Sequence, residues 1–187
     1  MLVLTQMNTH VIGLGCPQFK IAVYIANRPK IEPYTFFDSL ISVSDGEIAH
    51  IGTQCGNGWR KVFNVYAKLL YALDKHHFAE FQTAQTWQLY RDHTLLQSNS
   101  KTALLFSPPK LDLDTNTIHI ICGRTYANEL QRSEKITSQC VLLNEEFAID
   151  EKNQVIVCPY FDYRQLSNIK IEFLAQLILS LRHPKTK

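Results

Sequence analysis

The sequence predicts an α/β fold in which a four-stranded parallel sheet lies between two layers of helices, a three-layer α/β/α arrangement. Four short apolar runs, at 20–26, 102–107, 117–123 and 154–159, each stop at a proline, a glycine or a polar turn. They are apolar throughout, which is typical of strands buried on both faces of a parallel sheet. Helical patterns separate them, as crossover connections between parallel strands require. We expect a single domain over 1–187.

Apolar residues recur every three or four positions in several segments, which predicts amphipathic helices. The clearest of these runs from Gly58 to Leu73 and has one broad core face. The last segment, 169–182, is apolar on most sides, so we expect a deeply packed helix with Ser167 or Asn168 as its N-cap. The other expected elements are a short helix at 34–41, a helix at 77–97, a helix at 125–131 and a short strand at 140–143.

Composition limits the function classes. The net charge is +2 and the pI is about 8.2, so the charge balance neither supports nor excludes a nucleic-acid role, which would need a local site. The five cysteines include no CxxC pair, and we expect no metal and no cofactor. Cys122 and Cys158 are expected to be buried thiols in a reducing, cytoplasmic protein. No apolar run suits a membrane span, and the first residues lack the layout of a signal peptide.

In parallel sheets ligands bind beyond the carboxyl ends of the strands. The first and fourth strands end in the most polar and aromatic stretches, 27–29 and 159–162, so we expect the site there, together with the turn at 56–61. That turn reads GNGWRK and opens a helix. The free N–H groups of a helix start favour an anion, and Arg60 and Lys61 would add positive charge. The alternative is a plain turn before a helix.

Four segments, in this order, resemble those of the uracil-DNA glycosylase superfamily, in its mismatch-specific thymine/uracil branch. The resemblance extends over residues 20–180 or so and implies the same four-stranded parallel sheet between helices. IANRP (25–29) resembles the GINPG motif, GNGWRKVFNVY (56–66) resembles the GN-[RH]-F-W-K segment, HIICGRTYANEL (119–130) resembles the LLG-[RK]-x-A segment, and 154–178 stands where the family has a strand, an N-P-S-G or H-P-S-G loop and the final helix.

The resemblance implies cleavage of the N-glycosidic bond of a flipped nucleotide, with DNA, a nucleobase or a nucleotide as the partner. Asn27 matches the asparagine that positions the attacking water, which implies a catalytic role. Asn57 matches an asparagine of the base pocket, and Arg60 or Arg164 would meet a phosphate. The candidates for the aromatic platform under the base are Tyr34, Phe36, Phe37 and Trp59.

The loop PYFDYRQ after the fourth strand differs from the family's small N-P-S-G loop and supports an alternative. Tyr160 stands at the family's Asn or His position in the pocket, while Asp162 would repel a phosphate. Tyr160, Phe161 and Tyr163 also predict an aromatic patch, so the alternative is a non-catalytic relative that acts as a binding or interaction module. A small anionic ligand, such as a nucleotide at the Gly58 helix start, is compatible with both.

Overall fold

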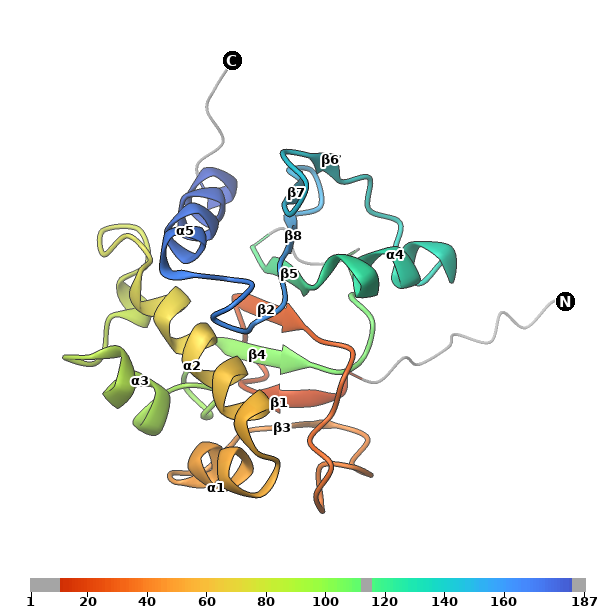
Figure 1. Ribbon diagram of the computed structural model, residues 1–187. Coiled ribbons are helices and arrows are strands. Elements are labelled where there is room, and N and C mark those ends of the chain that lie inside the picture. The colour runs from red at the N-terminus through yellow and green to blue at the C-terminus, as the bar shows by residue number, and fades with distance from the viewer. Residues whose placement is uncertain (1–10, 112–115, 183–187) are drawn as a thin grey trace, which may run out of the picture.

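The computed structural model describes residues 11–111 and 116–182, and in these ranges the chain forms one sheet of eight strands in the order β3-β1-β4-β2-β5-β8-β7-β6 (Figure 1). The four central strands, β4, β2, β5 and β8, are parallel to one another. The strands are β1 (Gly13–Gly15), β2 (Ile21–Tyr24), β3 (Leu40–Ile41), β4 (Thr102–Leu105), β5 (Ile118–Cys122), β6 (Val141–Leu142), β7 (Ala148–Asp150) and β8 (Val155–Cys158).

The prediction of an α/β fold is confirmed, but the sheet is larger than predicted and mixed in direction. The four apolar runs of the sequence are the four central strands, and every one of their residues is buried. Antiparallel strands extend the sheet on both sides: β1 pairs with β4, and β7 pairs with β8. Because β1 and β7 have three residues each, they are too short for a hydrophobic period to identify them.

Helices cover both faces of the sheet, and one layer is much thicker than the other. In Figure 1, α1, α2, α3 and α5 lie on one side of the sheet and α4 lies on the other. The core divides accordingly, since alternate residues of β5 and β8 pack toward α2 and α5 or toward α4. The helices are α1 (Glu47–Gln54), α2 (Asn57–Tyr71), a 3-10 turn (Ala79–Phe81), α3 (Trp87–His93), α4 (Arg124–Arg132) and α5 (Asn168–Arg182).

Three helix predictions need correction. Residues 34–41 form turns that lead into β3, and the expected helix at 77–97 is reduced to the 3-10 turn and α3. Thr86 is the N-cap of α3, and its side chain accepts a hydrogen bond from the N–H of Leu89 at 3.2 Å. α3 therefore begins as a helix separate from the 3-10 turn. The final helix is buried along one side only, because Phe173 on its outer side remains 39% exposed. Within the described ranges, no helix combines the length and apolar character that crossing a bilayer requires.

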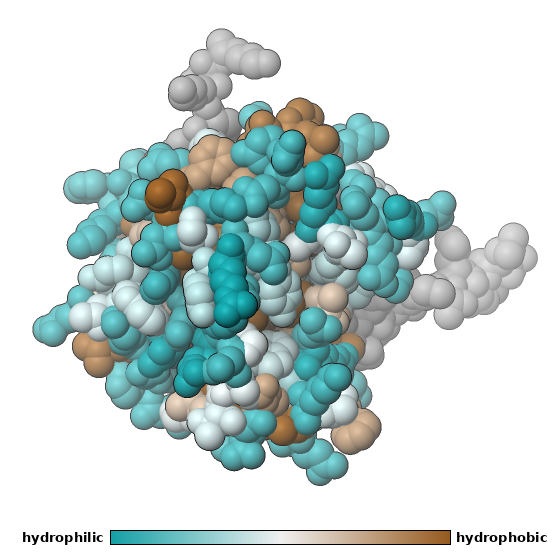
Figure 2. All heavy atoms as spheres, viewed as in Figure 1, coloured by the Kyte–Doolittle hydropathy of each residue, from teal (hydrophilic) through white to brown (hydrophobic). Residues whose placement is uncertain are grey.

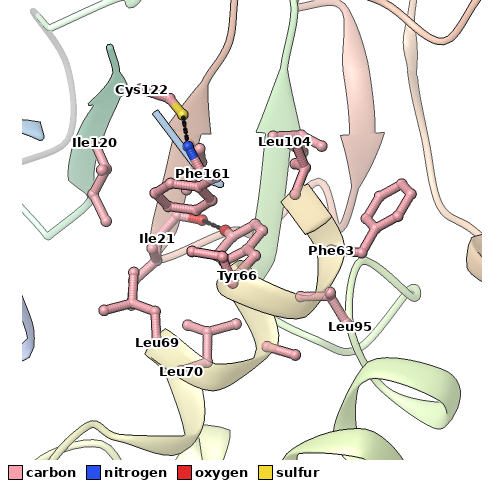
Figure 3. Packing of buried hydrophobic residues seen from close by; sticks show 14 of the residues in the cluster. Ile21, Phe63, Tyr66, Leu69, Leu70, Leu95, Leu104, Ile120, Cys122 and Phe161 are labelled. Carbon is pink, nitrogen blue, oxygen red and sulfur yellow. Dashed lines mark hydrogen bonds between the residues drawn. The ribbon is translucent and has the colours of Figure 1, made fainter. Parts of the chain in front are cut away.

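Tyr66 of α2 anchors the thick layer to the sheet (Figure 3). Its hydroxyl lies between two strand carbonyls and is 3.3 Å from the oxygen of Ile21 and 3.0 Å from that of Ala103. Phe161, just beyond β8, packs edge-on against the Tyr66 ring with centroids 5.8 Å apart. The backbone N–H of Phe161 donates to the Cys122 sulfur at 3.1 Å. The residues after β8 are therefore held firmly to the core.

The thiols of Cys122 and Cys158 are buried and form no disulfide, as predicted. Burial raises the pKa of the Cys122 thiol to about 12. It also raises the pKa of the Cys158 thiol. Neither residue is therefore an ionised nucleophile at neutral pH.

Candidate active site

A cavity of about 450 Å³ opens at the carboxyl ends of β2, β5 and β8, beside the first turn of α4. This is the edge of the sheet at which parallel α/β folds bind ligands, and the volume suits a small molecule. The polar side chains that line the cavity are Asn27, Arg124, Thr125, Tyr126, Glu129, Glu145, Glu146, Tyr160 and Gln165.

Asn27 and Tyr160 meet at this cavity. Asn27 follows β2, Tyr160 follows β8, and both side chains line the cavity. Burial raises the pKa of the half-buried Tyr160 phenol, while the neighbouring Asn27 side chain acts in the opposite direction. The Asn27 amide and the Tyr160 hydroxyl can each donate and accept a hydrogen bond, so together they offer a ligand both kinds of partner.

The first turn of α4 forms a second wall. Gly123, at the end of β5, has a φ of +102°, a backbone conformation that favours glycine. This conformation turns the chain sharply from the strand into the helix, and no side chain caps the helix start. The N–H groups of the first turn therefore lack a side-chain partner beside a cavity that Arg124 and Thr125 line.

The side chains around the cavity are acidic on balance, with three glutamates against one arginine. Arg124 is itself engaged, because its Nη1 donates to the backbone oxygen of Glu145 at 2.6 Å. Glu146 pairs with Lys170 of α5 at 2.5 Å. On α4, burial and the nearby charge of Glu129 raise the pKa of the Tyr126 phenol. With Glu146 paired to Lys170, Glu129 and Glu145 stand against Arg124, and the negative charge that remains disfavours a phosphate.

The predicted pocket residues at the start of α2 are not brought to this cavity. Trp59 is 8% exposed and belongs to the core, where its ring lies 5.8 Å from that of Phe63 and 6.1 Å from that of Phe106. Asn57 is exposed and accepts a hydrogen bond from the Arg60 guanidinium. Arg60 lines a separate hollow of about 160 Å³ between α1, α2 and α3. The glycine-flanked turn is therefore the start of a core helix outside the candidate site.

Phe37 and Arg164 also lie outside the cavity lining. Arg28 donates to the backbone oxygen of Phe37 at 3.1 Å, and its guanidinium lies 5.7 Å from the ring centroids of Phe37 and Phe106. Phe37 is thus a packing partner of Arg28, the residue that separates Asn27 from Pro29. Arg164 is exposed in the loop after β8, where its backbone N–H donates to an Asp162 carboxylate oxygen at 2.9 Å.

The loop after β8 does not present the predicted aromatic patch. Phe161 is completely buried, so only Tyr163, 55% exposed, and the half-buried Tyr160 remain at the surface. Asp162 forms an ion pair with Lys61 of α2 at 2.9 Å, and the Lys61 ammonium lies 4.8 Å from the Tyr163 ring centroid. The loop is fixed to α2 through these contacts.

Several cavity residues had no local signal in the sequence. Glu145 and Glu146 belong to the turn between β6 and β7, which reaches the cavity only because the sheet places β7 beside β8. Glu129 looks like any surface residue of an amphipathic helix. Among the residues that the structure describes, no group of three His, Cys, Asp or Glu side chains is arranged to hold a metal ion.

Comparison with known proteins gives one match. The model of a family described as a family of unknown function, DUF6942, matches residues 12–179, which include all the strands and the cavity. No curated protein and no solved structure matched the chain.

Proposed function

We propose that the chain, which belongs to the DUF6942 family, binds a nucleoside in the cavity at the strand ends and hydrolyses the N-glycosidic bond between its base and its sugar. A nucleoside carries a nucleobase and no phosphate. The observation that supports this most directly is that Asn27 and Tyr160, from two different strand ends, line one small cavity together with three glutamates. The resemblance of the sequence around Asn27 to a glycosylase motif points in the same direction.

The proposed reaction needs groups of the kind that the cavity offers. A water oxygen bonds to the anomeric carbon of the sugar, the bond from that carbon to the base nitrogen breaks, and the sugar gains positive charge in the transition state. The Asn27 carbonyl oxygen would accept a hydrogen bond from the water and orient it. A cavity glutamate would take the proton of the water and stabilise the positive sugar. The base nitrogen would keep the electron pair of the broken bond, the Tyr160 O–H would donate a hydrogen bond to the departing base, and the base would then take up a proton from the glutamic acid or the solvent.

The charge of the lining favours a nucleoside over DNA. Binding to a nucleic-acid backbone depends on lysines and arginines that neutralise phosphates. Here Arg124 is the one basic residue of the lining, against three glutamates, and its guanidinium already binds a backbone oxygen. A neutral nucleoside avoids the repulsion, and a base that carries a positive charge would gain from it.

The test measures release of free base by chromatography. Wild-type protein is incubated with a panel of pyrimidine and purine nucleosides and, in parallel, with duplexes that contain uracil or a G·T mismatch. We expect base from a nucleoside, and Asn27→Ala should lower the rate by about 10²–10³, the usual cost of one group that positions or stabilises the reacting atoms.

Asn57→Ala is the matched control, because Asn57 matches the same family pattern but lies outside the cavity. It should keep the wild-type rate. Nucleosides that neither release base nor raise the unfolding temperature would refute the proposal. Base release from duplex DNA alone would refute the choice of substrate.

A further inference from the structure

The edge strand β6 has the residues of an interior strand. Val141 and Leu142 are 67% and 62% exposed, and Leu143, which follows them, is 44% exposed. Successive side chains of a strand point to opposite faces, so apolar side chains are exposed on both faces of the sheet at this edge. Figure 2 shows hydrophobic side chains gathered over the hairpin of β6 and β7. Continuous apolar runs of this kind are typical of strands that have a neighbour on each side.

Apart from its length of two residues, β6 lacks the usual protection of an edge strand. Natural proteins keep edge strands from pairing with other chains by placing charged residues or proline on them. Residues 136–144, ITSQCVLLN, contain neither. One side of β6 is paired with β7, through Val141 with Ile149 and Leu142 with Ala148. Its other side has no strand beside it in the described sheet.

We propose that β6 pairs with the β6 strand of a second copy of the chain, antiparallel and about a two-fold axis, so that the two sheets become continuous. The strand is self-complementary, because it is apolar and carries no charge. In antiparallel pairing centred on Leu142, Leu142 faces Leu142 of the second copy and Val141 faces its Leu143, so apolar side chains oppose each other and no like charges do. A two-fold dimer requires one patch that fits itself, and a short uncharged apolar strand meets that requirement.

Apolar surface beside the strand enlarges the interface. Phe173 of α5 is 39% exposed and packs edge-on against Phe147, with centroids 4.9 Å apart. Phe147 lies next to the strand, since its backbone oxygen accepts a hydrogen bond from the N–H of Leu143 at 2.9 Å. A stable interface buries about 800 Å² on each partner, which two strands alone do not provide. The α5 surface at Phe173 is the neighbouring apolar area that the second copy would cover.

The test is the oligomeric state in solution, measured by sedimentation or by light scattering over a range of micromolar concentrations. We expect a concentration-dependent dimer for the wild type. Leu142→Lys places two positive charges opposite each other and should raise the dimer dissociation constant by about tenfold or more. Val141→Lys tests the other face of the same strand. Phe36→Lys is the control, because Phe36 is 77% exposed in a distant loop, and it should leave the dimer unchanged.

Circular dichroism and the unfolding temperature establish that each variant is folded. A wild type that stays monomeric at every concentration would overturn the proposal, whether or not β6 binds some other extended peptide. Folded Leu142→Lys and Val141→Lys variants that dimerise as tightly as the wild type would overturn it equally.

Discussion

Replacement of Trp59 separates the two roles that sequence and structure assign to it. The resemblance to glycosylases makes Trp59 a candidate platform for a base, whereas the structure places its ring in the core between α2 and the residues after β4. A platform residue can be removed at little cost to folding but at a large cost to ligand binding. A core residue has the opposite profile, because its removal leaves a cavity in the protein.

The magnitude follows from burial. Trp59 is 8% exposed, and truncation of a buried tryptophan to alanine costs about 3–5 kcal/mol of the free energy of unfolding. For a domain of this size each kcal/mol lowers the unfolding temperature by about 2–4 °C, so Trp59→Ala should lower it by roughly 6–20 °C. Trp59→Phe gives up roughly 40 Å² of apolar area, worth about 1 kcal/mol at 25 cal/mol per Å². It keeps an aromatic ring near Phe63 and Phe106.

The assay is urea denaturation followed by far-UV circular dichroism, combined with the base-release measurement under native conditions. We expect Trp59→Ala to lower the denaturation midpoint strongly and Trp59→Phe to lower it slightly, with base release by Trp59→Phe equal to that of the wild type. A Trp59→Ala protein as stable as the wild type would show that the ring is not part of the core. A stable Trp59→Phe protein without activity would restore the platform role.

Two further changes test the backbone and the electrostatics. Gly123→Ala should lower the free energy of unfolding by about 1–2 kcal/mol, because the φ of Gly123 is +102°. Gly58 lies in the first turn of α2 with open space around it, so Gly58→Ala should raise the free energy of unfolding by up to about 1 kcal/mol. Thermal unfolding measures both changes. The backbone N–H of Arg164 lowers the pKa of the Asp162 carboxyl, and the ion pair with Lys61 lowers it further. The stability that these contacts confer is therefore present at neutral pH and is lost as the pH falls through the lowered pKa. Asp162→Asn should therefore lose about 0.5–1 kcal/mol at pH 7 and nothing at low pH, and an equal loss at both pH values would contradict the assignment.

The parts of the fold that the sequence predicted share one physical property. The central strands are buried on both faces, so their apolar runs are uninterrupted and lie between clear breaks. The long helix α2 has a wide buried face over more than three turns, which gives a strong period. In both cases a residue's burial is set by its own element, and a local window of sequence therefore carries the information.

The parts that were missed depend on distant neighbours. β1 contains two glycines and one leucine, and it is a strand because β4 pairs with it: a Cβ on Gly13 or Gly15 would lie 2.3 Å from a β4 backbone oxygen. α1 buries only Ile48 and Ile51, too few positions to define a period. The mixed edges of the sheet follow from such pairings, which no single segment encodes.

The candidate site divides in the same way. Asn27 and Tyr160 were predicted as residues beyond strand ends, and the structure brings them together because β2 and β8 both flank β5. Trp59 was assigned to the pocket because it follows a glycine turn, but it lies four positions before Phe63 on the same helix face, and that spacing indicates the core. The glutamates of the β6–β7 turn could not be assigned, since their approach to Asn27 depends on the whole sheet.

That turn connects the two proposals. The hairpin of β6 and β7 carries both the exposed edge at Leu142 and the cavity residue Glu145. These two residues are three positions apart in the chain. Arg124 holds the turn from α4 and Lys170 holds it from α5, so the acidic wall stands without a partner chain. A second copy paired along β6 would restrain the hairpin further but would supply no group to the cavity. Substitution of Leu142 therefore acts on association and substitution of Asn27 acts on the chemistry, so failure of one proposal leaves the other intact.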